Sequence, residues 1–310
     1  MLDFHESQHP ALGEGLITVN DSMPSLKSKR EGLVDPAKVQ YLIVDIHGGK
    51  HDFPFPKSVE PYLPQNGDLY QKYINAERDS GVPELTQELL KKFPCGLSLS
   101  VNPPRGVLDT IWATPANAIK KVVSPDIDPE AKKDFFEMHH NILELTAKVI
   151  ATLSSNVRIL CLHSMEPYNT PDQPKLAHDA ESIRKYIEAY ANRVLSEETI
   201  RKTDLIVGQN GQTPIGDMEM AREIEKLFQA KGYPIGYNDP YDTEPGFTDY
   251  DDMQKYPGRV HVVDILKPLL CEGSGDDRSF DTTNPRVDNN KVQIMAALYT
   301  EALSKILRAK

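Results

Sequence analysis

Short apolar runs and longer amphipathic patterns alternate along most of the chain. The clearest apolar runs are residues 39–46, 157–162 and 260–266, which are rich in β-branched residues and short for a helix. Residues 96–101 and 204–208 have the same character. Near-continuous apolar runs of this length predict strands that are covered on both faces.

Between these runs, apolar residues recur at the three- and four-residue spacing of an amphipathic helix. The predicted helices cover residues 82–93, 130–153, 180–194, 217–231 and 291–308. Strands that alternate with helices place helices on both faces of one sheet. The predicted fold is therefore α/β and three-layered, with a mostly parallel or mixed central sheet of the phosphorylase/hydrolase-like kind.

The first part of the chain differs from the rest. Residues 1–38 are polar and interrupted by proline and glycine, and we predict that they form an N-terminal arm. Residues 39–310 are predicted to form a single α/β domain. Within it, the proline-rich stretches 50–68 and 164–178 are predicted to be loops, which often wall a site.

Charge and composition narrow the possible partners. The 310 residues carry a formal net charge of −11. Nucleic acids and anionic membranes are bound through clustered basic residues, so we expect neither as a partner and favour a small molecule. No stretch approaches the ~20 apolar residues needed to span a bilayer, no signal peptide is evident, and the three cysteines are far apart. These features predict a cytoplasmic protein and leave its oligomeric state open.

Two histidines directly follow predicted strands. His47 ends the first apolar run and His163 ends the second. The carboxyl ends of parallel strands meet at one edge of a sheet, where ligands bind. A carboxylate from the turn 78–81 completes the three ligands that a catalytic zinc uses. A histidine at a strand end is more often a hydrogen-bonded structural residue, so spacing alone does not establish a metal site.

Other polar clusters are given structural interpretations. The pair His139 and His140 lies within a predicted long helix, where a solvated or satisfied core role is the default. The acidic run at residues 249–252 is predicted to be a solvated loop, because it lacks the glycine and distal glutamate of a calcium-binding loop. No G-x-S-x-G or glycine-rich phosphate loop is present.

Six segments match, in order and spacing, the motifs of one known family. They are HGG (47–49), DSGVPEL (79–85), FEMHHNIL (136–143), RILCLHSMEP (158–167), TDLIVG (203–208) and KGYPIGYNDPY (231–241). Through them the chain resembles the N-formylglutamate amidohydrolases over roughly residues 40–273. The fold of that family belongs with the zinc carboxypeptidase-like hydrolases, and the third matching segment keeps the histidine of the family's motif as His140.

The resemblance implies a metal site and a catalytic carboxylate. It implies that one Zn²⁺ is held by His47, His163 and Asp79, with Glu77 as the reserve candidate for the third position. The segment VVDILK (262–267) stands where the family has Gln-Leu-Glu-Ile-Asn-Arg, so Asp264 takes the place of the presumed catalytic glutamate. Asp264 is shorter by one methylene.

The chain departs from the family where the substrate is expected to bind. Ile111-Trp112 replaces an Asn-Arg pair, Gln209-Asn210 replaces Asp-Arg, and Lys267 replaces an arginine. Lysine cannot reproduce the two-pronged hydrogen bonding of arginine to a carboxylate. We therefore expect a changed substrate, more apolar near Trp112.

The remaining candidates line the expected pocket. Arg105 is the candidate for stabilising the oxyanion or one substrate carboxylate, with a surface salt bridge as its alternative role. Ser164, Asn238, Tyr241 and Lys267 are the candidates for substrate binding, although Asn-x-Pro-Tyr turns can be purely structural.

The leading hypothesis is a zinc-dependent amidohydrolase that cleaves the amide of an N-acyl amino acid, such as an N-formyl derivative, or of a similar small amide. Asp264 is expected to shuttle the proton. The alternatives are a carboxypeptidase-like metallopeptidase and a degenerate family member that binds a ligand without turnover.

Overall fold

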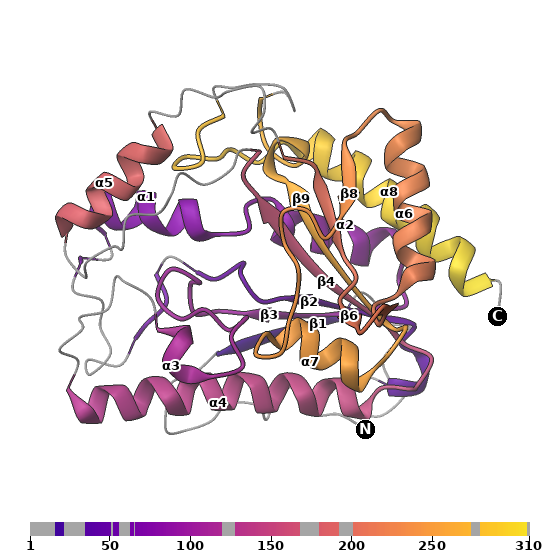
Figure 1. Ribbon diagram of the computed structural model, residues 1–310, viewed down its shortest axis with the longest axis horizontal. Coiled ribbons are helices and arrows are strands. Elements are labelled where there is room, and N and C mark those ends of the chain that lie inside the picture. Colours follow the sequence, from indigo (N-terminus) through magenta and orange to yellow (C-terminus); the bar gives the residue numbers. More distant parts are fainter. Residues whose placement is uncertain are drawn as a thin grey trace.

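The computed structural model describes residues 16–21, 35–50, 52–55, 63–64, 66–119, 128–167, 180–191, 201–273 and 280–308. In these residues a mixed seven-stranded sheet has the order β1-β3-β2-β4-β9-β5-β8 (Figure 1). Its strands are β1 (Ile17–Asp21), β2 (Tyr41–Asp45), β3 (Gly96–Val101), β4 (Arg158–Met165), β5 (Thr203–Ile206), β8 (Ile235–Tyr237) and β9 (Val260–Leu266).

The centre of the sheet is parallel and its flanks are mixed. Strands β3, β2, β4 and β9 run in the same direction. At one edge β1 is antiparallel to β3, and at the other β5 is antiparallel to β9 and parallel to β8. A separate two-stranded ribbon is formed by β6 (Gln209–Asn210) and β7 (Thr213–Pro214).

Helices cover both faces of the sheet (Figure 1). One face is packed by α2 (Val82–Lys92), α6 (Met218–Ala230) and α8 (Asn289–Arg308). The other is packed by α4 (Pro129–Thr152), α7 (Thr248–Lys255) and the short α3 (Pro115–Ala118). Helices α1 (Asp68–Glu77) and α5 (Ala180–Ala191) pack on each other at the left of Figure 1, and two 3-10 turns are η1 (Pro36–Lys38) and η4 (Lys267–Leu269).

The alternation of side chains along β2 explains the three layers. Leu42 and Val44 belong to the core that includes α4, whereas Tyr41 and Ile43 belong to the core that includes α2 and α8. Successive strand residues point to opposite faces, so a strand that is apolar at every position needs a helix layer on each side. The predicted three-layer α/β fold is confirmed.

Most predicted elements form close to their predicted bounds, and besides the short α3, the β6–β7 ribbon and the two 3-10 turns, four elements were not predicted. Strand β1 lies inside the predicted arm 1–38 and pairs with β3, so the domain begins before the predicted boundary at residue 39. The remainder of the arm, residues 1–15 and 22–34, lies outside the described residues. The other additions are α1, the edge strand β8 and α7.

Helix α7 corrects the interpretation of the acidic run 249–252. The run is helical, and Asp249 and Met253, four residues apart, are both buried. Residues at i and i+4 share one helix face, so this face turns inward while Asp251 is exposed.

The described helices include none that is long and apolar enough to cross a membrane. Cys95, Cys161 and Cys271 form no disulfide.

A buried histidine in β9 predicts that acid destabilises the fold. His261 is 2% exposed, and its Nε2 has no hydrogen-bond partner in the described part of the chain. Burial lowers its pKa to about 3, whereas an unfolded histidine titrates near pH ~6.5. The unfolded chain therefore binds one more proton between these values, and stability is lost as the pH falls through this window.

We expect His261→Leu to remove this dependence. Between pH 6.5 and 5 the wild type should lose about 1 kcal/mol per pH unit more than the variant, because only the wild type must desolvate a protonatable ring. Urea unfolding at several pH values measures the free energy of unfolding of the wild type and of the variant. Parallel stability profiles for the two proteins would contradict the expectation.

Candidate metal centre

Three buried side chains converge at the carboxyl ends of the central strands. His47 Nδ1 lies 3.1 Å from Asp79 Oδ2, His163 Nδ1 lies 3.0 Å from the same oxygen, and the two Nδ1 atoms are 3.1 Å apart. All three side chains are at most 4% exposed. The structure therefore brings the three predicted metal ligands into one triangle.

The local backbone explains how Asp79 reaches the two histidines. His47 follows β2, His163 lies within the neighbouring parallel strand β4, and Asp79 lies in the turn between α1 and α2. The Asp79 N–H donates to the His47 carbonyl at 3.3 Å. Gly81 continues this turn with φ +88°, and a Cβ there would lie 2.5 Å from Cβ of Leu270. A left-handed backbone against a neighbouring side chain requires glycine.

A second pair of carboxylates orients the two imidazoles. His47 Nε2 lies 3.0 Å from Asp109 Oδ1, and His163 Nε2 lies 3.2 Å from Asp249 Oδ2. A carboxylate accepts the Nε2 proton, which leaves the Nδ1 lone pair directed at the centre of the triangle. Metal-bound histidines in proteins are typically held in this way.

The donor set fits a divalent cation. Tetrahedral ligands with metal bonds of about 2.0–2.1 Å are separated by about 3.3 Å, close to the observed 3.0–3.1 Å. Asp79 Oδ1 is buried and has no hydrogen-bond partner among the described residues, and Arg105 Nη1 is 4.0 Å away. Two nitrogens and one carboxylate oxygen are the ligands of many catalytic zinc sites.

The electrostatics of the triangle favour positive charge. Burial lowers the pKa of His163, but its contacts with Asp249 and Asp79 outweigh burial and raise that pKa well above its usual value. Burial raises the pKa of Asp79, but His47 and His163 outweigh it and hold that pKa far below the usual value. Asp79 therefore remains ionised at a point that attracts a cation.

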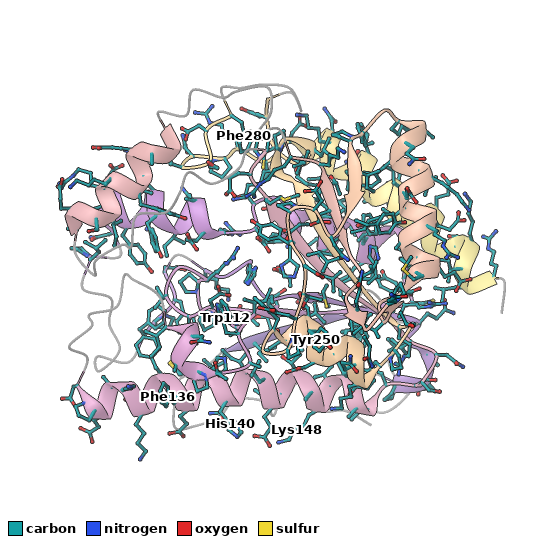
Figure 2. The ribbon with its side chains drawn as sticks, viewed as in Figure 1. Trp112, Phe136, His140, Lys148, Tyr250 and Phe280 are labelled. Atoms are coloured by element: carbon teal, nitrogen blue, oxygen red, sulfur yellow. The ribbon has the colours of Figure 1, made fainter. Side chains whose placement is uncertain are left out.

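The triangle opens into a cavity of about 370 Å³. His47, His163, Asp264, Arg105 and Trp112 are among the residues that line it. Trp112 packs on Phe247, with ring centroids 4.6 Å apart, and lies on the inner side of α4 (Figure 2). A cavity of this volume suits a small ligand.

Asp264 lies on β9 directly across from His163 on β4. It is half-buried and lines the cavity. Burial, together with nearby Asp79, raises its pKa to about 6, against the opposing influence of His163. A carboxylate at this place is within reach of a ligand held at the triangle.

Arg105 lies between two carboxylates of the site, Asp79 and Asp109. Its Nε lies 3.5 Å from Asp109 Oδ2, and its side chain keeps 31% of its surface exposed. Burial lowers its pKa, but Asp109, Glu77 and Asp79 outweigh burial and raise it. The guanidinium is therefore charged, lines the cavity and lies beside Asp109.

Two of the predicted substrate-binding residues line the cavity with their polar groups already bonded. Ser164 Oγ donates to the carbonyl of Ser80 at 3.1 Å. Lys267 is 1% exposed, and its Nζ donates to Glu166 Oε1 at 2.8 Å and to the carbonyl of Ala76 at 3.2 Å. Lys267 is thus committed to a buried ion pair, and Glu166 was not predicted.

The Asn-x-Pro-Tyr segment divides into a structural and a cavity-lining part. Asn238 Oδ1 accepts from the N–H of Val207 at 3.0 Å, and Asn238 is not among the lining residues. This corrects its predicted role to a structural one. Tyr241 lines the cavity, and its hydroxyl accepts from Arg201 at 3.0 Å. Buried Asp204 accepts from the Tyr241 N–H, which fixes the turn.

Glu77 lies outside the triangle. Its Oε1 accepts a hydrogen bond from the Tyr186 hydroxyl, and it lines the cavity. Between the two candidates for the third ligand, Asp79 is the one that joins both histidines.

The pair His139 and His140 is split between inside and outside. His140 is 75% exposed and points away from the sheet on the outer face of α4, near Lys148 (Figure 2). His139 is buried, and its Nε2 lies 2.7 Å from the carbonyl of Trp112. His139 therefore holds the Trp112 loop, whereas His140 has no place in the site.

Asp249 was missed because it lies in an acidic run that favours solvent. The spacing of Asp249 and Met253 could have identified Asp249. Residues four apart lie on the same face of a helix, and the apolar Met253 indicates that this face is buried.

No family model matches the sequence, and no curated protein matches it. Solved structures do match. The N-formylglutamate amidohydrolase from Ralstonia eutropha JMP134 superposes with a TM-score of 0.54 at 15% identity, covering 95% of this chain and 99% of that chain. The chain has the fold of an N-formylglutamate amidohydrolase. The gene product Atu2144 from Agrobacterium tumefaciens gives 0.52 at 13% identity, with 95% of each chain covered. The predicted resemblance is confirmed for the fold.

We expect Asp249→Asn to weaken zinc binding by about 10–100-fold. The neutral amide accepts the His163 Nε2 proton less strongly than the carboxylate, so the imidazole becomes a weaker ligand and its orientation is less fixed. Competition with a chromophoric chelator measures the dissociation constant. The matched control is Asp251→Asn on the exposed side of the same helix. Equal zinc affinities in the two variants would remove Asp249 from the site.

Proposed function

We propose that this protein is a metal-dependent hydrolase that cleaves the carbon–nitrogen bond of a small amide, with N-acyl amino acids as the expected substrates and zinc as the expected ion. The observation that carries the proposal is the triangle of His47, Asp79 and His163 at the cavity. Its support is the carboxylate behind each imidazole and the fold shared with an amidohydrolase.

When bound, zinc supplies a Lewis acid that polarises the amide carbonyl and lowers the pKa of water. Asp264 faces the same space and serves as the general base that accepts the proton of the attacking water. The protonated carboxyl then returns this proton to the leaving nitrogen, so that acid and amine products form. Arg105 stabilises the negative charge that develops on the carbonyl oxygen, or binds a substrate carboxylate.

The cavity wall opposes a second anionic group on the substrate. Lys267, in the place of a family arginine, is paired with Glu166. Ile111 and Trp112, in the place of Asn-Arg, line the cavity with apolar surface. A substrate with at most one carboxylate and an apolar part fits these changes better than a dicarboxylate.

We expect His163→Ala to lose about one equivalent of zinc and all measurable amide hydrolysis, because two ligands alone bind the ion weakly. Elemental analysis of the purified protein and an assay with N-formyl and N-acetyl amino acids measure the two effects. His140→Ala, a histidine on the outer surface, should keep both properties. Unchanged zinc content in His163→Ala would refute the site.

We expect Asp264→Asn to retain zinc and to lower kcat by about 10²–10⁴-fold, since the amide cannot take a proton. Asp264→Glu should keep measurable turnover because it retains the carboxylate. Full activity in the asparagine variant would exclude Asp264 as the base. A wild type that binds zinc and turns over neither acyl amino acids nor peptides would favour the ligand-binding alternative, and release of C-terminal residues from peptides would favour the carboxypeptidase-like one.

A further inference from the structure

One corner of the cavity combines a carboxylate with two tyrosine rings. Tyr73 and Glu77 lie four residues apart on α1, and Tyr186 reaches them from α5. All three line the cavity. The two rings have centroids 5.8 Å apart with an interplanar angle of 59°, and the Tyr186 hydroxyl donates to Glu77 Oε1. The hydrogen bond fixes the carboxylate beside the aromatic rings.

The charge of the lining is strongly negative. Six carboxylate side chains and two cationic side chains line the cavity among the described residues. One cation, Lys267, is neutralised by Glu166, and the other, Arg105, lies beside Asp79 and Asp109. A divalent ion at the triangle offsets only part of this excess. The field in the cavity therefore favours a substrate that carries positive charge.

We propose that Tyr73, Glu77 and Tyr186 form a subsite for an ammonium group, so that the substrate is the N-acyl derivative of a basic amino acid or of a related amine. The inference rests on the proposed amide hydrolysis. A carboxylate forms charge-assisted hydrogen bonds with an ammonium, and tyrosine rings attract a cation through their π faces.

Glu77 is close to the triangle along the chain. It lies two positions before Asp79, and two steps of extended chain span at most about 7 Å between Cα atoms. Arg78, between them, does not line the cavity. Because Glu77 and the triangle line one cavity, we expect a side chain of about four methylenes to extend from an amide at the triangle towards the Glu77 carboxylate.

The test compares two nearly isosteric substrates with the zinc-loaded full-length protein. Nα-formyl-L-lysine and Nα-formyl-L-norleucine differ mainly by the terminal ammonium. We expect kcat/KM for the lysine derivative to be at least ~10-fold higher, since a charge-assisted hydrogen bond of ordinary strength gives this ratio. In Glu77→Gln the preference should fall to within about twofold, with hydrolysis of the norleucine derivative and zinc content retained.

Two further variants keep the test decisive. Asp68→Asn removes the same charge from an 80% exposed position at the start of α1 and should keep the preference for lysine. Tyr186→Phe retains the ring and loses the hydrogen bond to Glu77, so the preference for lysine should fall severalfold. If the Glu77→Gln protein does not fold, Tyr186→Phe takes its place in the test.

The outcomes separate the subsite from the hydrolase. Equal rates for the two substrates in the wild type, or a preference that survives Glu77→Gln, would overturn the subsite and leave the hydrolase intact. Absence of hydrolysis with both substrates would instead refute the hydrolase for this class. Calorimetric titration with free L-lysine and L-norleucine then decides the subsite: tighter binding of lysine that is lost in Glu77→Gln supports it, and equal binding overturns it.

Discussion

The parallel pairing of β2, β4 and β9 is the constraint on which the site depends. It places the loop after β2 and the C-terminal parts of β4 and β9 at one edge of the sheet, which brings His47, His163 and Asp264 together. Successive side chains alternate along β4, so His163 points to one face of the sheet and Ser164 to the other. The Ser164 hydroxyl donates to the carbonyl of Ser80, in the turn that carries Asp79. A one-residue shift in register would exchange these directions and disperse the ligands.

The buried carboxylates around the triangle require compensating positive charge. Buried Asp79, Asp109 and Asp249 surround two imidazoles, and taking carboxylates out of water is unfavourable unless they are paired. Without a metal, the two Nδ1 atoms that face each other at 3.1 Å need a shared or added proton. A divalent ion held by His47, His163 and Asp79 Oδ2 would satisfy both lone pairs at once, and Asp109 and Asp249 would then stabilise the imidazoles that hold it.

The sequence predicted what depends on local pattern and failed where the answer depends on packing. Apolar runs and helical spacing were enough for the three layers and for placing His47 and His163 at strand ends. Strand β1 was not visible because a short edge strand carries polar residues and needs β3 to form. The role of Asp249 depends on the inward face of α7, and the neutralisation of Lys267 depends on Glu166, a partner 101 residues away.

The proposed catalytic groups and the proposed substrate-binding groups lie on different parts of the fold. Substrate preference can therefore change while the catalytic groups stay in place. The groups proposed to hold the ion and move the proton lie on or beside three paired strands, where a change in one residue disturbs packing on both faces. The groups proposed to meet the rest of a substrate come from α1, α5 and the loop of Trp112, and α1 and α5 pack on each other. Substitutions there alter charge and shape without moving the triangle. Ile111 and Trp112 give the cavity an apolar wall, and the pairing of Lys267 with Glu166 leaves the charge of the lining negative.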